Sequence, residues 1–150
     1  MDRRKFLGLG MAALALVPAT SLHALDFRKE KPDAWTAHTV DDSIKALYGD
    51  AKATESKDVT LKAPKVASNG GAIPVTIKTS IDAKSVAMFQ DSNPESAVAV
   101  WTVPEGGTVS YTTKIKMKKS GTITVIVEDK EGKLHSATQT LEVALGGCEG

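Results

Sequence analysis

The chain has 150 residues, of which 19 are Lys or Arg and 18 are Asp or Glu, so its formal net charge is +1. This length suits one domain, and a charge so close to zero gives no electrostatic footprint for nucleic acid. The hydrophobic fraction of 41% excludes general disorder. One cysteine cannot form an internal disulfide or a thiolate metal cage, and His23, His38 and His135 lie too far apart to suggest a ligand cluster.

Residues 1–24 have the pattern of an export signal. A charged start is followed by an apolar run of about ten residues, which is too short to span a bilayer because about 20 are needed. Arg3 and Arg4, followed by Lys5-Phe6-Leu7, are similar to the twin-arginine motif R-R-x-F-L. A general secretory signal that happens to contain two arginines is the alternative. Either signal predicts a periplasmic protein that is not inserted in the membrane.

Residues 25–56 are expected to form a lead and one short helix. The polar segment 25–38 predicts an extended chain. Thr39 is a candidate N-cap for a helix over residues 40–48, which has two aspartates in its first turn and apolar residues at i, i+4 and i+7. Gly49 is a natural end for that helix.

From residue 57 the hydrophobic period changes from 3.6 to 2, and turn residues recur about every ten positions. Pro74 suits a sheet edge or the start of a strand, and Trp101, inside an apolar run, is the expected core anchor. An all-β, immunoglobulin-like antiparallel β-sandwich is therefore predicted for residues 57–144. Its seven strands are expected near residues 58–62, 73–77, 85–90, 97–103, 109–117, 122–127 and 134–143.

The segment 145–150 predicts a thin, flexible arm that carries a thiol. Gly146 and Gly147 precede Cys148, and the extended distance from Gly146 to Cys148 is roughly 10 Å. A thiolate is a nucleophile and a point of covalent attachment. The expected site is therefore Cys148, with the arm made of Gly146, Gly147, Glu149 and Gly150.

A thiol on such an arm suits a carrier protein, in which the cysteine holds a group covalently and the arm presents it elsewhere. Other functions of the cysteine are alternatives to this one. It can serve as an intermolecular disulfide anchor, so that the protein is a periplasmic immunoglobulin-like interaction module, or it can be an accidental free thiol. An enzyme is not predicted, because no Ser-His-Asp arrangement, paired acid set or phosphate loop is visible. His38 and His135 are expected to be solvated or to form local hydrogen bonds. No metal or other cofactor is predicted.

Several stretches together resemble the SoxY family, the sulfur carriers of bacterial thiosulfate oxidation. The family tail Gly-Gly-Cys-Gly-Gly is similar to Gly-Gly-Cys-Glu-Gly at residues 146–150. Residues 64–74 (PKVASNGGAIP) are similar to a P-x-x-A-x-N-G-x-x-x-P stretch of the family. Asn93-Pro94 with the strand to Trp101, and the runs 114–117 and 131–134, also have counterparts there. The resemblance covers most of residues 57–150.

The resemblance implies an immunoglobulin-like fold and a heterodimer with SoxZ, a second β-sandwich protein. It implies that a c-type haem enzyme joins thiosulfate oxidatively to Cys148, and that a manganese-dependent hydrolase then releases sulfate. A sulfane sulfur stays on the cysteine, and a sulfane dehydrogenase is a further possible transient partner. The carrier itself needs no cofactor and performs no catalysis.

Glu149 is the one departure from the family tail, which has Gly there. A carboxylate beside the thiol disfavours the thiolate, so it should raise the thiol pKa by less than one unit, given about 1 kcal/mol for two charges at 4 Å in water. Glu149 is also bulkier than Gly. Two alternatives are open: either Glu149 is merely tolerated in the tail, or it is recognised by a matched set of partners with a basic residue at the right place, as in a paralogue with altered partners.

Overall fold

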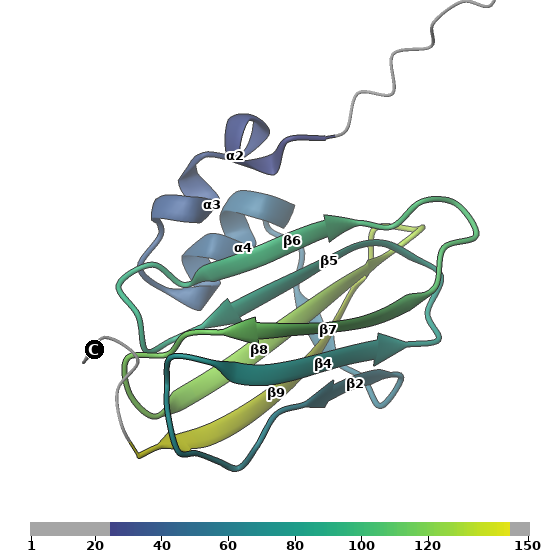
Figure 1. The fold of residues 1–150 in the computed structure, drawn as a ribbon. Helices are drawn as coiled ribbons and strands as arrows, with labels where there is room; N and C mark the ends of the chain where they lie inside the picture. The colour runs from purple at the N-terminus through teal and green to yellow at the C-terminus, as the bar shows by residue number, and fades with distance from the viewer. Residues whose placement is uncertain (1–24, 145–150) are drawn as a thin grey trace, which may run out of the picture.

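The computed structural model describes residues 25–144, in which two β-sheets pack face to face (Figure 1). The larger sheet has the strand order β1-β9-β8-β5-β6, with β3 added beside β9, and the smaller has the order β2-β4-β7. This confirms the predicted immunoglobulin-like sandwich. The strands are β1 Ala53–Glu55, β2 Val59–Lys62, β3 Val66–Ala67, β4 Ile73–Thr79, β5 Ala83–Gln90, β6 Ala97–Thr102, β7 Val109–Ile115, β8 Gly121–Asp129 and β9 Leu134–Val143.

All seven predicted strands are present, and two further short strands were not predicted. β1 and β3 both pair in parallel with β9, whereas every other pair in the two sheets is antiparallel. With three and two residues, they are too short for an alternating pattern to reveal them.

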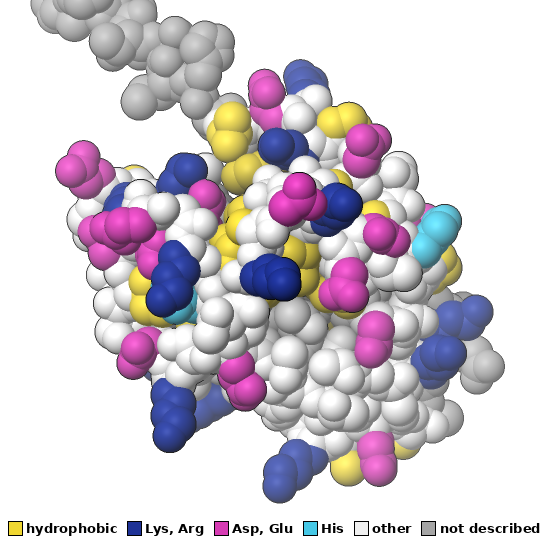
Figure 2. Space-filling view, turned by 180° about the vertical axis from the view of Figure 1, so that it is seen from behind, with side chains coloured by type: hydrophobic (Ala, Val, Ile, Leu, Met, Phe, Trp, Pro, Cys, Tyr) yellow, Lys and Arg dark blue, Asp and Glu magenta, His cyan; other side chains and the backbone are white. Residues whose placement is uncertain are grey.

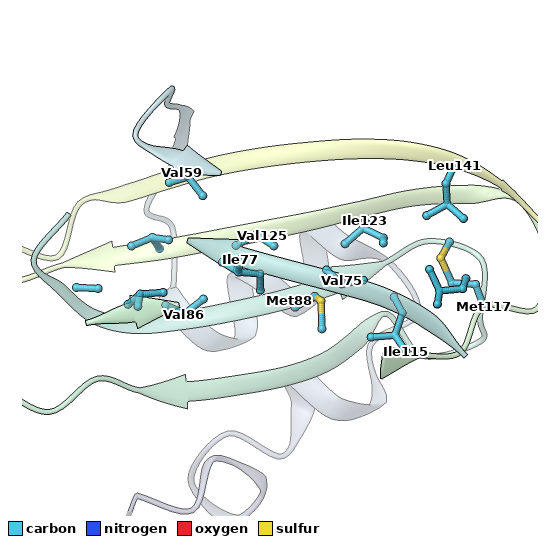
Figure 3. Close-up of a cluster of buried hydrophobic side chains, with 14 of the residues drawn as sticks. Val59, Val75, Ile77, Val86, Met88, Ile115, Met117, Ile123, Val125 and Leu141 are labelled. Atoms are coloured by element: carbon cyan, nitrogen blue, oxygen red, sulfur yellow. The ribbon is translucent and has the colours of Figure 1, made fainter. Parts of the chain in front are cut away.

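The core lies between the two sheets and follows from the alternation along each strand. In β4, for example, Ile73, Val75 and Ile77 are buried while Pro74 and Lys78 face solvent. Figure 3 shows side chains of this cluster from both sheets, including Val75, Val86, Met88, Ile123 and Val125. No disulfide is available to hold the sheets, so burial of these side chains is the main stabilising term.

Pro74 occupies the second position of β4, so it is at a strand start, as predicted. β4 itself is the central strand of the smaller sheet. Its pairing with β2 begins only at Thr76, opposite Lys62, whereas its pairing with β7 already includes Pro74 opposite Lys114. The proline therefore lies beyond the end of the β2 ladder, where a missing N–H removes no bond.

The prediction that Trp101 is the core anchor is wrong. Trp101 lies on β6, an edge strand of the larger sheet, and is only partly buried. Its ring packs at 5.2 Å, centroid to centroid, against Tyr111 of β7, on the neighbouring edge of the smaller sheet. Among the aromatic side chains of residues 25–144, the fully buried one is Phe89 on β5. An apolar run does not distinguish a central strand from an edge strand.

The predicted helix is present as α4, Val40–Tyr48. The Thr39 hydroxyl accepts a hydrogen bond from the Asp42 N–H, and Gly49 ends the helix with φ of 71°. The extended chain predicted for residues 25–38 is wrong, because two helical turns form there: α2, Phe27–Glu30, and α3, Asp33–Thr36. Each has four residues, so neither shows a helical period in the sequence.

The three helices cover the outer face of the larger sheet. Ala34 and Leu47 pack with Phe89 and Ile126 in a second buried cluster. Ser43 of α4 is fully buried and hydrogen-bonds Ser96, just before β6. On the face seen from behind, acidic and basic side chains are interspersed around hydrophobic ones (Figure 2). None of the helices within residues 25–144 has the length and apolar character needed to cross a bilayer.

Candidate functional site

The described chain leads into the C-terminal segment from a firmly held strand end. The Ala144 N–H donates to the Ala67 carbonyl at 2.9 Å, and the Glu142 N–H donates to the Lys65 carbonyl at 2.9 Å. From the other side, the Val143 N–H donates to the Ser120 hydroxyl at 2.9 Å. The end of β9 is therefore held between β3 and the β7–β8 loop, and the position of residue 144 is fixed.

The β7–β8 loop on one side of this strand end is itself anchored. Met117 is fully buried, and its N–H donates to the Gly70 carbonyl at 2.9 Å. Figure 3 shows Met117 at the same end of the core as Leu141 of β9. Asn93 holds the flanking residues: its side-chain amide donates to the Lys116 carbonyl at 2.8 Å, and its carbonyl oxygen accepts from the Lys118 N–H at 2.8 Å.

The β5–β6 loop that contains Asn93 is organised by one buried glutamine. The Gln90 carbonyl oxygen accepts from the Ser92 N–H and the Asn93 N–H, both at 2.7 Å, and from the Ser92 hydroxyl at 3.0 Å. Its amide donates to the Glu95 carbonyl at 2.7 Å. A buried polar side chain with this many partners indicates that the loop has a defined shape.

A cavity of about 770 Å³ lies beside the same strand end, lined by residues of β9 and by the chain from the end of β2 to the start of β3. Gln139 of β9 fixes this connection, because its side chain both donates to the Ala63 carbonyl and accepts from the Ala63 N–H. The lining residues are Lys62, Ala63, Lys65, Val66, Gln139, Thr140, Leu141 and Glu142.

Ionisable groups with shifted pKa values lie away from this strand end and have structural roles. Burial raises the pKa of Tyr48 to about 12, and the Tyr48 hydroxyl reaches Ser85, which donates to Glu128 at 2.8 Å. At the β8–β9 turn, a hydrogen bond from His135 at 2.8 Å is the main reason that the pKa of Asp129 is lowered.

The predicted site residues Cys148, Gly146, Gly147, Glu149 and Gly150 lie outside the described residues, as do Arg3 and Arg4 of the signal motif. His135 forms a local hydrogen bond with Asp129, as expected. His38 is exposed, as expected, but its hydrogen bond is to the Pro94 carbonyl, which is far away in the sequence. Within residues 25–144, no three His, Cys, Asp or Glu side chains gather as a metal site would require. Sequence reasoning missed the cavity, because Lys62 and Lys65 are far in sequence from the β9 residues that complete it.

Comparison with known families identifies the family to which the chain belongs. The model of the family described as "Sulfur oxidation protein SoxY" matches residues 44–148, more than half of the sequence, and this match ends at Cys148. The chain belongs to the SoxY family. It shares 32% sequence identity with the structure of the sulfur carrier protein SoxY from Chlorobium limicola f thiosulfatophilum, with a TM-score of 0.64, over 69% of this chain and 94% of that chain.

Other solved structures share the fold only. A superoxide reductase (neelaredoxin) from Ignicoccus hospitalis matches with 17% identity and a TM-score of 0.52, over 66% of this chain and 86% of that one. A putative superoxide reductase from Thermotoga maritima matches with 15% identity and a TM-score of 0.50, over 61% of this chain and 93% of that one. No curated protein matches the chain in sequence. The fold brings Asn69-Gly70 and Asn93 to one end of the sandwich, because Gly70 binds Met117 and Asn93 binds the residues on both sides of it.

Proposed function

We propose that this chain is a covalent sulfur carrier that holds thiosulfate-derived groups on the thiol of Cys148. The observation that carries the proposal is the SoxY family match, which extends through this cysteine. The similar SoxY structure is that of a sulfur carrier protein. Residues 145–150 act as the carrier arm, the sandwich 57–144 as its support, and residues 1–24 as the twin-arginine export signal to the periplasm.

The chemistry expected at Cys148 follows from balancing the bonds. The thiolate and thiosulfate lose two electrons as a sulfur–sulfur bond forms between them, and a c-type haem enzyme accepts these electrons. Water then attacks the terminal sulfonate sulfur in a hydrolase, releasing sulfate and protons and leaving a persulfide on the cysteine. The carrier supplies the thiol and its placement, and the partner enzymes supply the redox and hydrolytic groups.

The proposed permanent partner is a SoxZ-like β-sandwich subunit. Strand β6 supports this, because it is an edge strand of the described sheet and its apolar side chains Val98, Val100 and Trp101 are only partly buried. Exposed apolar edges are surfaces on which a second β-protein can dock. Co-purification of the two proteins at micromolar concentration tests this. Two separate monomers on size exclusion would contradict it.

The carrier role is tested by intact-mass analysis of protein purified from cells grown on thiosulfate. We expect adducts of one thiosulfate or one additional sulfur on the wild-type chain, and none on the variant Cys148→Ser. The variant should also abolish thiosulfate oxidation in a reconstituted system. If wild-type protein carries only a disulfide to a second copy, and Cys148→Ser supports an unchanged rate, the chain is an interaction module and not a carrier.

A further inference from the structure

We propose that the outer face of the smaller sheet is a docking surface for an acidic face of a transient protein partner. This lysine face consists of the outward residues of β2, β4 and β7, which include Lys62, Lys78 and Lys114. The inference rests on the proposed carrier function for one point, the identity of the partner as an enzyme that loads or unloads the carrier.

No other element of residues 25–144 covers the lysine face. The three helices pack on the outer side of the larger sheet, so the smaller sheet forms the opposite outer layer of the molecule (Figure 1). Along its strands, inward residues such as Val75 and Ile115 are buried, whereas Lys62, Lys78 and Lys114 are exposed. The outward side chains of all three strands are therefore available to a partner.

The lysine face carries positive charge only. The segments 59–81 and 106–127 contain seven of the chain's 19 basic residues and none of its 18 acidic residues. The antiparallel pairing of β4 with β7 lays these two segments side by side. Within residues 25–144, Lys62, Lys78 and Lys114 have no carboxylate within 4.0 Å, whereas four other lysines do. On the face seen from behind in Figure 2, by contrast, charges of both signs are interspersed.

Protection of the sheet edges accounts for only part of this pattern. Lysines on edge strands hinder the addition of a further strand, and β2 and β7 are the edge strands of the smaller sheet. This explains Lys62 and Lys114. Lys78, however, is on the central strand β4, between Thr60 and Ser110 of the two neighbouring strands, where no edge needs protection. A positive charge in the middle of the face suits the binding of an anionic surface over all three strands.

The size and polarity of the lysine face favour a transient protein partner. Three strands about 4.8 Å apart and up to seven residues long cover roughly 14 Å by 24 Å, on the order of 350 Å². Total interface areas below about 1,200 Å² are typical of weak redox encounters, whereas permanent subunits bury larger and more apolar surfaces. A surface that binds membranes inserts Trp, Phe or Leu. The outward residues here are Thr, Ser, Lys and Pro, and the Thr76 and Thr112 hydroxyls bond each other at 3.1 Å.

The distribution of charge along the lysine face gives the docked partner a direction. At one end of the sheet, carboxylates lie just beyond the strands: Asp58 before β2, Asp82 after β4 and Glu105 before β7. At the other end, the β7–β8 loop adds three lysines within residues 116–119. This loop also binds the end of β9, through Ser120 and Val143. An acidic partner is therefore drawn toward the end of the sandwich where β9 leads into the carrier segment.

Titration of ¹⁵N-labelled chain 25–150 with poly-L-glutamate tests recognition of an acidic polypeptide, and poly-L-lysine of the same length is the matched control. At 0.01 M salt the screening length is about 30 Å, which exceeds the face, so its lysines act together. We expect poly-glutamate to shift the amide signals of Thr76, Lys78 and Thr112, and poly-lysine to shift none of them. Shifts centred instead on Lys31 and Lys52, beside the helices, would overturn the docking surface.

Vesicles of phosphatidylglycerol and phosphatidylcholine test an anionic membrane as the other occupant. We expect the chain to stay in the supernatant when these vesicles are sedimented at 0.15 M salt. Co-sedimentation that is lost in the variant Lys78→Glu with Lys114→Glu would make the membrane the occupant and would overturn the protein partner.

Two charge-reversal pairs locate the effect in the reconstituted thiosulfate-oxidising system. Lys78→Glu with Lys114→Glu changes the lysine face, and Lys31→Glu with Lys52→Glu makes the same change in net charge at exposed lysines beside the helices. Each exposed ion pair changes an equilibrium constant about 1.5- to 5-fold and reversal turns attraction into repulsion, so the first pair should raise the KM of the loading enzyme for the carrier at least about 5-fold. The kcat should not change, and the second pair should leave KM nearly unchanged. Lys78→Gln with Lys114→Gln repeats the test if the reversal lowers the melting temperature.

An unchanged KM for the Lys78 and Lys114 variant, or equal increases for both pairs, would overturn the docking surface while thiosulfate adducts on the wild-type chain still support the carrier role. Missing adducts would overturn the carrier role. The poly-glutamate titration would then still decide whether the lysine face binds an acidic polypeptide, because no Sox enzyme takes part in it.

Discussion

Replacing Gln90 by Leu should destabilise the protein more than any other single polar substitution near the end of β9. Leucine keeps about the same volume but removes four hydrogen bonds, three to Ser92 and Asn93 and one to the Glu95 carbonyl. A net 0.5–1.5 kcal/mol per bond gives roughly 2–6 kcal/mol. Burial of the leucine side chain and access of water to the exposed Glu95 offset part of this. We expect a loss of about 3 kcal/mol in the free energy of unfolding.

Gln139→Leu is the matched control. Gln139 is a partly buried glutamine with two hydrogen bonds, both to Ala63 of the β2–β3 connection. The same net value of 0.5–1.5 kcal/mol per bond gives a loss of roughly 1–3 kcal/mol before the offsetting terms.

Urea unfolding of chain 25–150 measures both variants. The melting temperature provides a second measure, because a domain of this size loses about 4 °C per kcal/mol. If Gln90→Leu costs less than Gln139→Leu, the buried network at Gln90 does not hold the β5–β6 loop, and the account of this end of the sandwich is wrong.

Three further predictions concern other parts of the fold. Phe89→Ala should cost about 3–5 kcal/mol in urea unfolding, because this fully buried ring joins the helices to the larger sheet; a loss below 1 kcal/mol would contradict the shared core. Tyr48, whose folded pKa is about 12 against an ordinary 10.0, stabilises the fold below pH 10 and loses that contribution as the pH rises toward 12. Tyr48→Phe should therefore flatten the alkaline limb of a stability–pH curve, and an unchanged limb would refute this. Asp129 has a lowered folded pKa, so its contribution is present above its ordinary pKa of about 3.9 and is lost as the pH falls below it. Asp129→Asn should reduce that acid loss, measured by urea unfolding between pH 6 and about pH 3; equal acid slopes would count against the His135 bond.

The strands and the helix α4 were predictable because their signals are local. A strand with one buried face alternates with period 2, and β4 and β7 do so over seven residues each. Helix α4 is flanked by residues that are typical helix caps, Thr39 at its start and Gly49 at its end. The turns α2 and α3 carry no such pattern, since a period of 3.6 cannot be read from four residues. α3 is stabilised by burial of Ala34 in the cluster that it shares with α4, and α2 by partial burial of Phe27 against the same cluster. Both are tertiary effects.

The position of a strand within its sheet was not predictable in the same way. The run AVAVWT of β6 is as apolar as a central strand, yet β6 has a neighbour on one side only, and its residues are partly buried. The cavity illustrates the same limit. Lys62 ends β2 and Lys65 lies in the connection to β3, whereas the other wall of the cavity comes from β9, more than seventy residues later. The parallel pairing of β3 with β9, over two residues, and the hydrogen bonds between Gln139 and Ala63 bring them together.

The motif residues that mark the family resemblance gather at one structural location, and this gives them a common physical role. The Gly70 carbonyl binds Met117, Asn93 binds the residues on both sides of Met117, and Ser120 at the end of that loop binds Val143. These contacts fix the last described residues of the chain from both sides. An arm of a few residues can deliver a thiol accurately only if its base does not move, because any displacement of the base adds directly to the distance the arm must cover. Cys148 is four residues beyond Ala144, so a fully extended chain between them spans about 13–14 Å. On the proposed carrier function, the carboxylate of Glu149 favours partner enzymes that have a basic residue near the entrance of the active site.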